Sequence, residues 1–325
     1  MAGEKTKVII SVSSIALTVA LVITMVFILK KFEKEEEPEI KETVVDTDVV
    51  SFGGSDYVLN KDISTFLAIG LDVTNKENED GVEQKQADFI LLFVFDAKNE
   101  KITALHINRD TVTDVNMLAL DGTRVKTVKE PIALAHSEGD GKEMSCRNTA
   151  EAVSDLLLGV KIDNYASFTM DTVPVINDSV GGITVTIEDD MTSVDPAFIK
   201  GATVKLVGDQ ALKFVRARGG LEDSSNAKRM TRQREYLLKL FAAVREKNEA
   251  DDEYLINIFP TISDSIVTDC SLTRLNSLQE TFSGYTFSGF IDIEGESKIG
   301  ERFMEFYPDK DALEKTVIDL FYVKK

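Results

Sequence analysis

The sequence predicts an α/β domain behind a single N-terminal transmembrane helix. Three short runs rich in Ile, Leu, Val and Phe, at residues 64–72, 87–96 and 101–110, have the composition of buried strands. Between residues 146 and 188, helical and strand patterns alternate, as they do where helices pack on a sheet. At the start of the chain, residues 8–29 carry no charge.

The uncharged run divides the chain into four parts. Its 22 residues would form a helix of about 33 Å, enough to cross a bilayer, behind a short polar stretch at residues 1–7. A cleaved signal peptide would have a shorter apolar run and a small-x-small cleavage site, which this segment lacks. Residues 30–48 are highly charged and predict a stalk, and residues 49–325 would form the folded domain. Lysines flank the run on both sides, so the positive-inside rule does not set its orientation.

Acidic and basic residues meet at the ends of the predicted strands. Residues 97–100 have the length of a hairpin loop, so the second and third strands should pair antiparallel. Counting outward from this loop places Asp88 opposite Arg109, and Asp72 closes the preceding strand. We therefore expect Asp72 and Asp88 to converge near Arg109 and Asp110.

Paired carboxylates beside a phosphate site suggest Mg²⁺, which binds through one or two carboxylates and phosphate oxygens. On this interpretation Asp72 and Asp88 are the metal ligands. The alternative is that each Asp merely ends a strand, where Asp is common.

A basic stretch interrupts an otherwise acidic chain. The formal net charge is −19, yet residues 213–234 contain seven basic residues and only two acidic ones. Five of the seven are arginines, whose planar guanidinium suits phosphate oxygens. A bound phosphate group is the favoured interpretation, and a solvated basic helix face is the alternative.

Two helices should carry this basic stretch. Asp209 can cap the first, which the Gly219-Gly220 pair would end. In the second, which starts near residue 227, helical periodicity places Arg229, Arg232 and Gln233 beside the buried face, while Arg234 points elsewhere. Other expected helices span residues 146–159, 171–180, 254–265, 272–282 and 309–322, and other expected strands span 164–170, 182–188 and 289–293.

Other chemistries have little support in the sequence. GxxxxGK[ST], HExxH, CxxC and GxSxG motifs are absent, and His106 and His136 are the only histidines. His106 lies inside a strand and should be a packed core residue, whereas His136 lies in a Gly-flanked segment and should be more open. Cys146 and Cys270 could form a disulfide or remain buried thiols. The acidic net charge argues against nucleic-acid binding.

Taken together, several motifs resemble the LytR-CpsA-Psr family of membrane-anchored bacterial cell-wall proteins. They cover roughly residues 66–241 and occur in the family's order: LAIGLD, QAD before a strand, INRDT, LLLGVKIDNY, NDSVGGITVTI, GDQALKFVRAR and RMTRQREYL. Each motif is weak alone, but the set is specific. The resemblance implies a mixed β-sheet flanked by helices, with a hydrophobic pocket for a polyprenyl chain and arginines that hold its pyrophosphate.

The resemblance also implies a function. Family members are understood to move glycopolymers from an undecaprenyl-pyrophosphate carrier onto peptidoglycan, with Mg²⁺ assisting. The N-terminus would be cytoplasmic and the domain would lie outside the cell membrane. Carried over by position, the metal-associated carboxylates are Asp72 and Asp88, the diphosphate ligands are Arg109, Arg216, Arg218, Arg229, Arg232 and Gln233, and Arg109, Asp110 and Asp223 would serve catalysis.

Two departures from the family pattern leave roles open. Asn226 stands where many members have an acidic residue, and Asp223 is the nearest carboxylate in sequence. Lys129 or His136 could replace a lysine that many members carry. The base that takes the acceptor's proton could be Asp88 or Asp223. A non-catalytic carrier-binding protein, a pyrophosphate hydrolase and, less favoured, a transcription regulator are the alternative functions.

Overall fold

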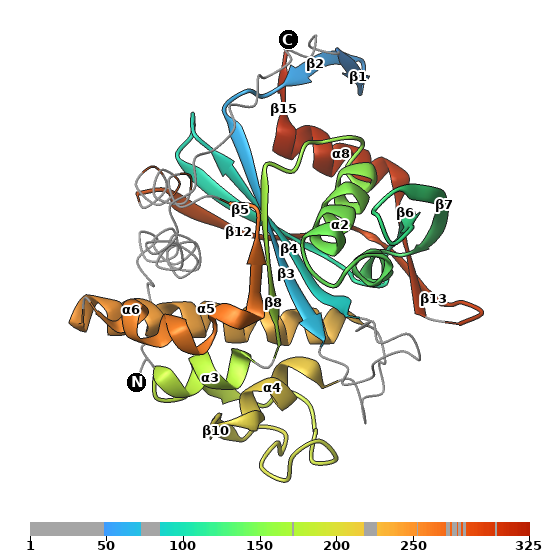
Figure 1. Ribbon diagram of the computed structural model, residues 1–325. Coiled ribbons are helices and arrows are strands. Elements are labelled where there is room, and N and C mark those ends of the chain that lie inside the picture. Colours follow the sequence, from blue (N-terminus) through green and yellow to red (C-terminus); the bar gives the residue numbers. More distant parts are fainter. Residues whose placement is uncertain are drawn as a thin grey trace, which may run out of the picture.

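A mixed six-stranded sheet forms the centre of the protein in the computed structural model (Figure 1). The structure describes residues 49–72, 85–170, 172–217, 226–251, 253–270, 284–302 and 304–325, together with Arg274, Leu278 and Thr281. The strand order is β11-β8-β3-β4-β5-β12. These strands are β3 (Ile63–Asp72), β4 (Gln86–Asp96), β5 (Lys101–Ile107), β8 (Asn164–Thr169), β11 (Ile266–Thr268) and β12 (Thr286–Asp292).

Strand directions in this sheet confirm the mixed topology. β4 runs antiparallel to both β3 and β5, as the short loop between β4 and β5 predicts. β8 is parallel to β3, and β12 is parallel to β5, so both pairs need long crossover connections. β4 lies at the centre and is buried on both faces, which explains its continuous apolar sequence.

The two faces of the sheet carry different core clusters. On one face, Leu67 and Ile69 pack with residues of α2 (Glu143–Leu156) and α8 (Lys310–Phe321). On the other face, Phe66 and Ala68 alternate with them and join a cluster that Leu212 and Leu237 contact. These last two residues belong to α4 (Asp209–Arg216) and α5 (Asn226–Ala250).

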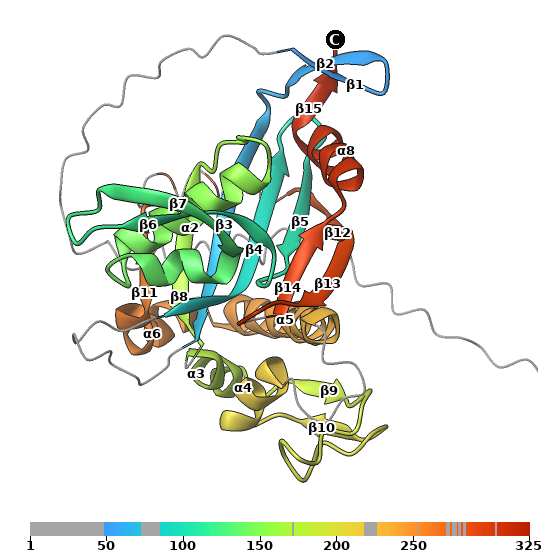
Figure 2. The same ribbon diagram turned by 90° about the vertical axis from the view of Figure 1, so that its right-hand side faces the viewer.

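Long helix α5 crosses one end of the sheet, with a further layer below it (Figure 2). That layer contains α3 (Thr172–Ser179), α4 and the hairpin of β9 (Thr184–Thr186) and β10 (Thr203–Lys205), which share a third core cluster with α5. Smaller elements complete the described fold: β1 (Val50–Phe52), β2 (Ser55–Leu59), β6 (Val112–Leu118), β7 (Arg124–Pro131), η2 (Ile132–Glu138), α6 (Tyr254–Ile258), η3 (Phe259–Thr261), η4 (Ser263–Ser265), β13 (Gly295–Ile299), β14 (Met304–Pro308) and β15 (Tyr322–Lys324).

The C-terminal helices agree with the predicted pattern in part. α8 begins after Asp309, whose side chain accepts a hydrogen bond from the Ala312 amide at 2.9 Å. The single helix expected over residues 254–265 is instead α6 followed by two short 3₁₀ turns, because Pro260 cannot continue an α-helix. Most of the helix expected over residues 272–282 lies outside the described residues.

Neither cysteine forms a disulfide. Cys146 and Cys270 are both fully buried thiols, and they belong to the core clusters on opposite faces of the sheet. Of the two alternatives for these residues, a disulfide or buried thiols, the structure shows buried thiols.

The predicted anchor at residues 8–29, the stalk at residues 30–48 and the stretch before them lie outside the described residues. Within the part that is described, no helix combines the length and the apolar character needed to cross a membrane.

Candidate functional site

A β-bulge brings Asp88 into contact with two arginines. The pairing of β3 with β4 shifts between Gly70 and Leu71, which face Phe89 and Ala87, so Asp88 is the extra residue. Its carboxylate forms ion pairs with Arg109 and, at 3.5 Å, with Arg229. All three side chains are largely buried. The expected proximity of Asp88 and Arg109 follows from the β4–β5 register, in which Ile90 faces Ile107.

Arg109 is held by further partners at the end of β5. Its Nη2 donates to Gln86 Oε1 at 2.5 Å, and its Nε lies 3.4 Å from Asp110 Oδ1. The backbone amide of Asp110 donates to Asn108 Oδ1 at 3.0 Å. The predicted neighbours Asp88, Arg109 and Asp110 are thus together.

Asp72 forms an ion pair with Arg216, a contact that the sequence did not predict. It ends β3, as predicted, and its Oδ1 and Oδ2 lie 2.5 and 2.7 Å from Arg216 Nη2. Arg216 is the last residue of α4, and its side chain is 42% exposed. The structure therefore contains two Asp–Arg groups, one around Asp88 and one around Asp72.

The start of α5 is tied to the end of β5 by an amide pair. Asn226 Nδ2 donates to Asn108 Oδ1 at 2.7 Å, and both side chains are buried. The first turn of α5 contains no acidic residue. Asn226 therefore forms a neutral contact at the position where it departs from the family pattern.

Arg232 and Gln233 both bond to the end of α4. Arg232 Nε donates to the Phe214 carbonyl at 3.3 Å and its Nη2 donates to the Ala217 carbonyl, while Gln233 Nε2 donates to the Val215 carbonyl at 3.3 Å. Burial lowers the pKa of the Arg232 guanidinium from its ordinary value, and the nearby Asp189 opposes this shift.

Arg234 points away from these groups, as its helical position predicts. Its Nη1 donates to Asp292 Oδ2 at 2.8 Å, and its Nε donates to His106 Nδ1 at 3.0 Å. His106 is a packed core residue, as predicted, and its ring lies 5.0 Å from the Phe89 ring. Burial first, and then the charges of Arg234 and Arg229, hold the pKa of His106 well below its ordinary value.

The expectation that His136 is open is wrong. It is fully buried, its Nδ1 lies 2.9 Å from the Lys85 carbonyl, and its Nε2 lies 3.7 Å from Cys146 Sγ. Burial lowers the pKa of His136 to about 4. Lys129 is exposed and pairs with Asp114 at 2.9 Å. Neither residue lies among the Asp–Arg groups described above.

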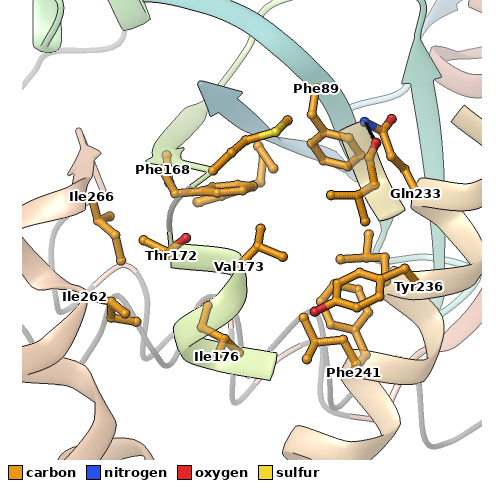
Figure 3. Close-up of a pocket in the computed structure, with 17 residues that line it drawn as sticks. Phe89, Phe168, Thr172, Val173, Ile176, Gln233, Tyr236, Phe241, Ile262 and Ile266 are labelled. Atoms are coloured by element: carbon orange, nitrogen blue, oxygen red, sulfur yellow. Dashed lines mark hydrogen bonds between the residues drawn. The ribbon is translucent and has the colours of Figure 1, made fainter. Parts of the chain in front are cut away.

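An apolar cavity opens between the sheet and α5 (Figure 3). Its volume is about 1000 Å³ when the open mouth is included. Ile262 and Ile266 line the side opposite Tyr236 and Phe241. The sheet contributes Phe66, Ala68, Phe89, Ala166 and Phe168. Helices α3, α4 and α5 contribute Val173, Ile176, Val215, Gln233, Leu237 and Leu240.

The Asp–Arg groups adjoin this cavity through three elements. On β4, Asp88 directly precedes the lining residue Phe89, and on α4, Arg216 directly follows the lining residue Val215. On α5, Arg229 lies one helical turn before the lining residue Gln233. One end of the apolar cavity therefore carries the guanidinium groups of Arg109, Arg216 and Arg229, which come from separate parts of the chain.

The donor set at this end fits Mg²⁺. Within the described part of the chain, no group of three or more His, Cys, Asp and Glu side chains could hold a metal. Mg²⁺ nevertheless needs only one or two carboxylates when phosphate oxygens and waters complete its shell. Asp72 and Asp88 supply such hard oxygens, and both are anchored by arginines.

Two predicted site residues lie outside the described part of the chain, and two residues of the site were not predicted from the sequence. Arg218 and Asp223, expected as a diphosphate ligand and a catalytic residue, lie outside the described residues. Gln86 and Asn108, which hold Arg109, Asp110 and Asn226, were not expected. Gln86 could have been found because it lies two residues before Asp88 on the same strand.

The model of the LytR_cpsA_psr family matches residues 22–317, and the chain belongs to this family. The expected family is thereby confirmed.

A curated protein is similar to part of this chain. The chain is 30% identical over 141 residues to "Polyisoprenyl-teichoic acid--peptidoglycan teichoic acid transferase TagU" of Bacillus cereus (strain AH820), a match that covers 43% of this chain and 42% of that protein. The chain spans less than half the length of the first curated relatives it matches.

Two solved structures have a fold similar to that of this chain. Protein gbs0355 of Streptococcus agalactiae has a TM-score of 0.64 at 19% identity, over 79% of this chain and 87% of that one. TagT bound to LI-WTA has a TM-score of 0.57 at 18% identity, over 80% of this chain and 90% of that one.

Proposed function

We propose that this protein transfers a lipid-linked cell-wall glycopolymer from an undecaprenyl-pyrophosphate carrier to peptidoglycan. The observation that carries the proposal is the apolar cavity with arginines from α4, α5 and the segment after β5 at one end. Such a site suits a ligand with a long hydrocarbon tail and a diphosphate head. Family membership and the name of the TagU relative support the same activity, and the TagT structure supports a glycopolymer as partner.

The carrier would bind through two separate interactions. Its isoprenoid chain would enter the cavity, where removal of apolar surface from water drives binding. Its diphosphate would contact Arg109, Arg216 and Arg229, together with Arg218. Guanidinium groups bind phosphate oxygens in a bidentate way, and burial of Arg109 and Arg229 would strengthen their contacts.

The reaction that fits this arrangement is phosphoryl transfer. A peptidoglycan hydroxyl would attack the phosphorus that carries the polymer, and the bond from this phosphorus to the bridging oxygen of the carrier would break. The hydroxyl proton would pass to a carboxylate, with Asp88 and Asp223 as the candidates. Polyprenyl phosphate would leave, and Arg109 would neutralise the charge that develops on it.

Asp72 and Asp88 would hold Mg²⁺ at the same end of the cavity. The bound cation would supply further neutralisation of the diphosphate charge. The arginines that these carboxylates contact would keep them oriented toward the phosphates.

The position of the protein in the cell is part of the proposal. Residues 8–29 would anchor it in the cell membrane with residues 1–7 in the cytoplasm, and the stalk at residues 30–48 would hold the domain outside. In this arrangement the carrier reaches the cavity from the bilayer, and peptidoglycan reaches the same site from the cell wall.

A product assay with the full chain in detergent tests the proposal. Incubation with labelled lipid-linked polymer and peptidoglycan fragments should yield labelled peptidoglycan. Arg216→Ala should abolish the product, whereas Lys213→Ala should not, since Lys213 lies on the same helix with similar exposure but pairs with Asp195. Release of free phosphorylated polymer would identify a hydrolase, and retention of intact substrate by a protein that forms no product would identify a carrier-binding protein.

A second variant tests the cavity. Ala68 and Ala166 face each other on β3 and β8, and both line the cavity. Ala68→Leu should lower the affinity for a long polyprenyl pyrophosphate but leave the affinity for a short-chain pyrophosphate unchanged. Equal losses for both ligands would contradict the placement of the hydrocarbon chain.

A further inference from the structure

The end of α4 is capped by side chains from α5. The carbonyls of Phe214, Val215 and Ala217 accept hydrogen bonds from Arg232 and Gln233, as described above. A helix end leaves its last carbonyls without partners in the helix, and these carbonyls carry a partial negative charge. Arg232 therefore places a full positive charge on the negative end of α4.

Arg232 differs from the other arginines near the cavity. Arg109, Arg216 and Arg229 all form ion pairs with Asp72 or Asp88. Within the described part of the chain, Arg232 forms no ion pair, and two of its three guanidinium nitrogens bond to carbonyls of α4 or the residue after it. Its side chain is only 7% exposed.

This cap lies directly beside a proposed phosphate ligand. Arg216 is the last residue of α4 and stands between two of the bonded carbonyls, those of Val215 and Ala217. The direction of its side chain toward Asp72 depends on the conformation of this last turn. Without a cap, the turn would fray, and its carbonyl dipoles would oppose a nearby diphosphate.

We propose that Arg232 is a positioning residue that caps α4 and thereby directs Arg216 toward the diphosphate, without contacting the phosphates itself. This inference rests on the proposed function for the identity of the ligand. It assigns to Arg232 a different role from the direct phosphate ligand that its sequence position suggests.

The test combines binding with hydrogen exchange in the full chain in detergent. The variants are Arg232→Met, Arg232→Lys, Arg216→Ala, the double variant of Arg216→Ala with Arg232→Met, and the control Lys239→Met. Lys239 lies on the same helix and pairs with Glu235. The ligand is undecaprenyl pyrophosphate, and the exchange readout is the backbone amides of residues 213–217.

Arg232→Met should weaken binding at least about tenfold, as expected for the loss of charged hydrogen bonds, and should speed exchange at residues 213–217. Arg232→Lys retains a cation that can reach the carbonyls. It should therefore recover part of the binding affinity and part of the protection from exchange. The double variant should bind no more weakly than Arg216→Ala alone, because Arg232 acts through Arg216. Lys239→Met should change neither readout.

Two outcomes would overturn the inference. If the losses of the two single variants multiply in the double variant while exchange at residues 213–217 stays at the wild-type rate, Arg232 contacts the phosphates directly. If Arg232→Met bound undecaprenyl pyrophosphate as tightly as the wild type, Arg232 would have no role in binding the ligand. Failure of the proposed function is distinguishable, since then Arg216→Ala itself would not weaken binding, while the exchange readout would still decide whether Arg232 caps α4.

Discussion

At the scale of single residues, Asp88 contacts two arginines, whereas Asp72 and Asp110, the other described carboxylates of the candidate site, each contact one. Its ion pairs with Arg109 and Arg229 are buried, and both guanidinium groups would remain in place if the carboxylate were removed. Loss of one member from a buried ion pair is costly because the other charge is left uncompensated.

We therefore expect Asp88→Asn to lower the free energy of unfolding by about 3 kcal/mol and to remove polymer transfer. Urea unfolding and the product assay measure the two effects. Asp114→Asn is the matched control, because Asp114 is 45% exposed in its pair with Lys129 and should cost little. Equal unfolding midpoints for the two variants would contradict the structural role of Asp88.

His136 predicts a pH dependence of stability. Its folded pKa of about 4 lies below the ordinary value of 6.5, so the unfolded chain takes up a proton over this range that the folded chain excludes. The free energy of unfolding should consequently fall as the pH drops from about 6.5 to about 4, by up to about 3 kcal/mol.

Comparison with His136→Asn isolates this contribution. The Asn side chain can still donate a hydrogen bond toward the Lys85 carbonyl, but it does not titrate. The stability advantage of the wild type over the variant should be largest at pH 7 and should shrink toward pH 4.5 in urea unfolding. If the difference in unfolding free energy between wild type and variant stayed constant across this pH range, His136 would have the same pKa in the folded and unfolded chains, which would contradict the prediction.

Prediction from sequence succeeded for residues whose neighbours are set by local geometry. Counting along one hairpin was enough to pair Asp88 with Arg109, because antiparallel register is fixed by the loop. Arg216, the partner of Asp72, lies 144 residues away, and no local pattern indicates that contact. His136 was misjudged for the same reason, since the contacts that bury it come from Lys85 and Cys146.

At the scale of elements, the bulge between β3 and β4 depends on a glycine. A Cβ atom on Gly70 would lie 2.9 Å from Phe89 Cβ and 3.3 Å from Met170 Cε. Both neighbours line the cavity, and Phe89 directly follows Asp88. A side chain at this position would therefore disturb the cavity and the ion pairs together.

Gly70→Ala should lower the free energy of unfolding by about 1–3 kcal/mol through overpacking and should weaken polyprenyl-pyrophosphate binding. Gly284→Ala is the control, because no atom lies within 4 Å of its added Cβ. Thermal unfolding and ligand titration provide the two measurements. If Gly70→Ala behaved like Gly284→Ala in both, the close contact would have no consequence.

Long apolar elements were predictable, and short polar ones were not. Strands β3, β4 and β5 were located from composition, since each is buried along most of its length. The hairpin of β6 and β7 was missed, because β7 is mostly exposed and its sequence RVKTVKEP lacks a continuous apolar run. The broken helix at α6 shows how one proline, Pro260, changes an otherwise helical pattern.

At the scale of the whole molecule, the proposed metal and the fold should be separable. Asp72 and Asp88 already contact arginines, so the fold does not need a cation to neutralise them. We expect a chelator to reduce polymer transfer strongly, with recovery on addition of Mg²⁺, while the thermal unfolding midpoint stays unchanged. A fall in that midpoint would indicate a structural metal, and full activity in the chelator would exclude the proposed role of Mg²⁺.

The paired Asp and Arg side chains also affect which anions the site can retain. An arriving anion does not meet bare cations, because it must replace a carboxylate that already belongs to the protein. The net gain from exchanging one negative partner for another is small, so free nucleotides and inorganic phosphate should compete poorly. If the proposed function holds, selectivity would depend on contacts between the apolar cavity and the hydrocarbon chain of the carrier.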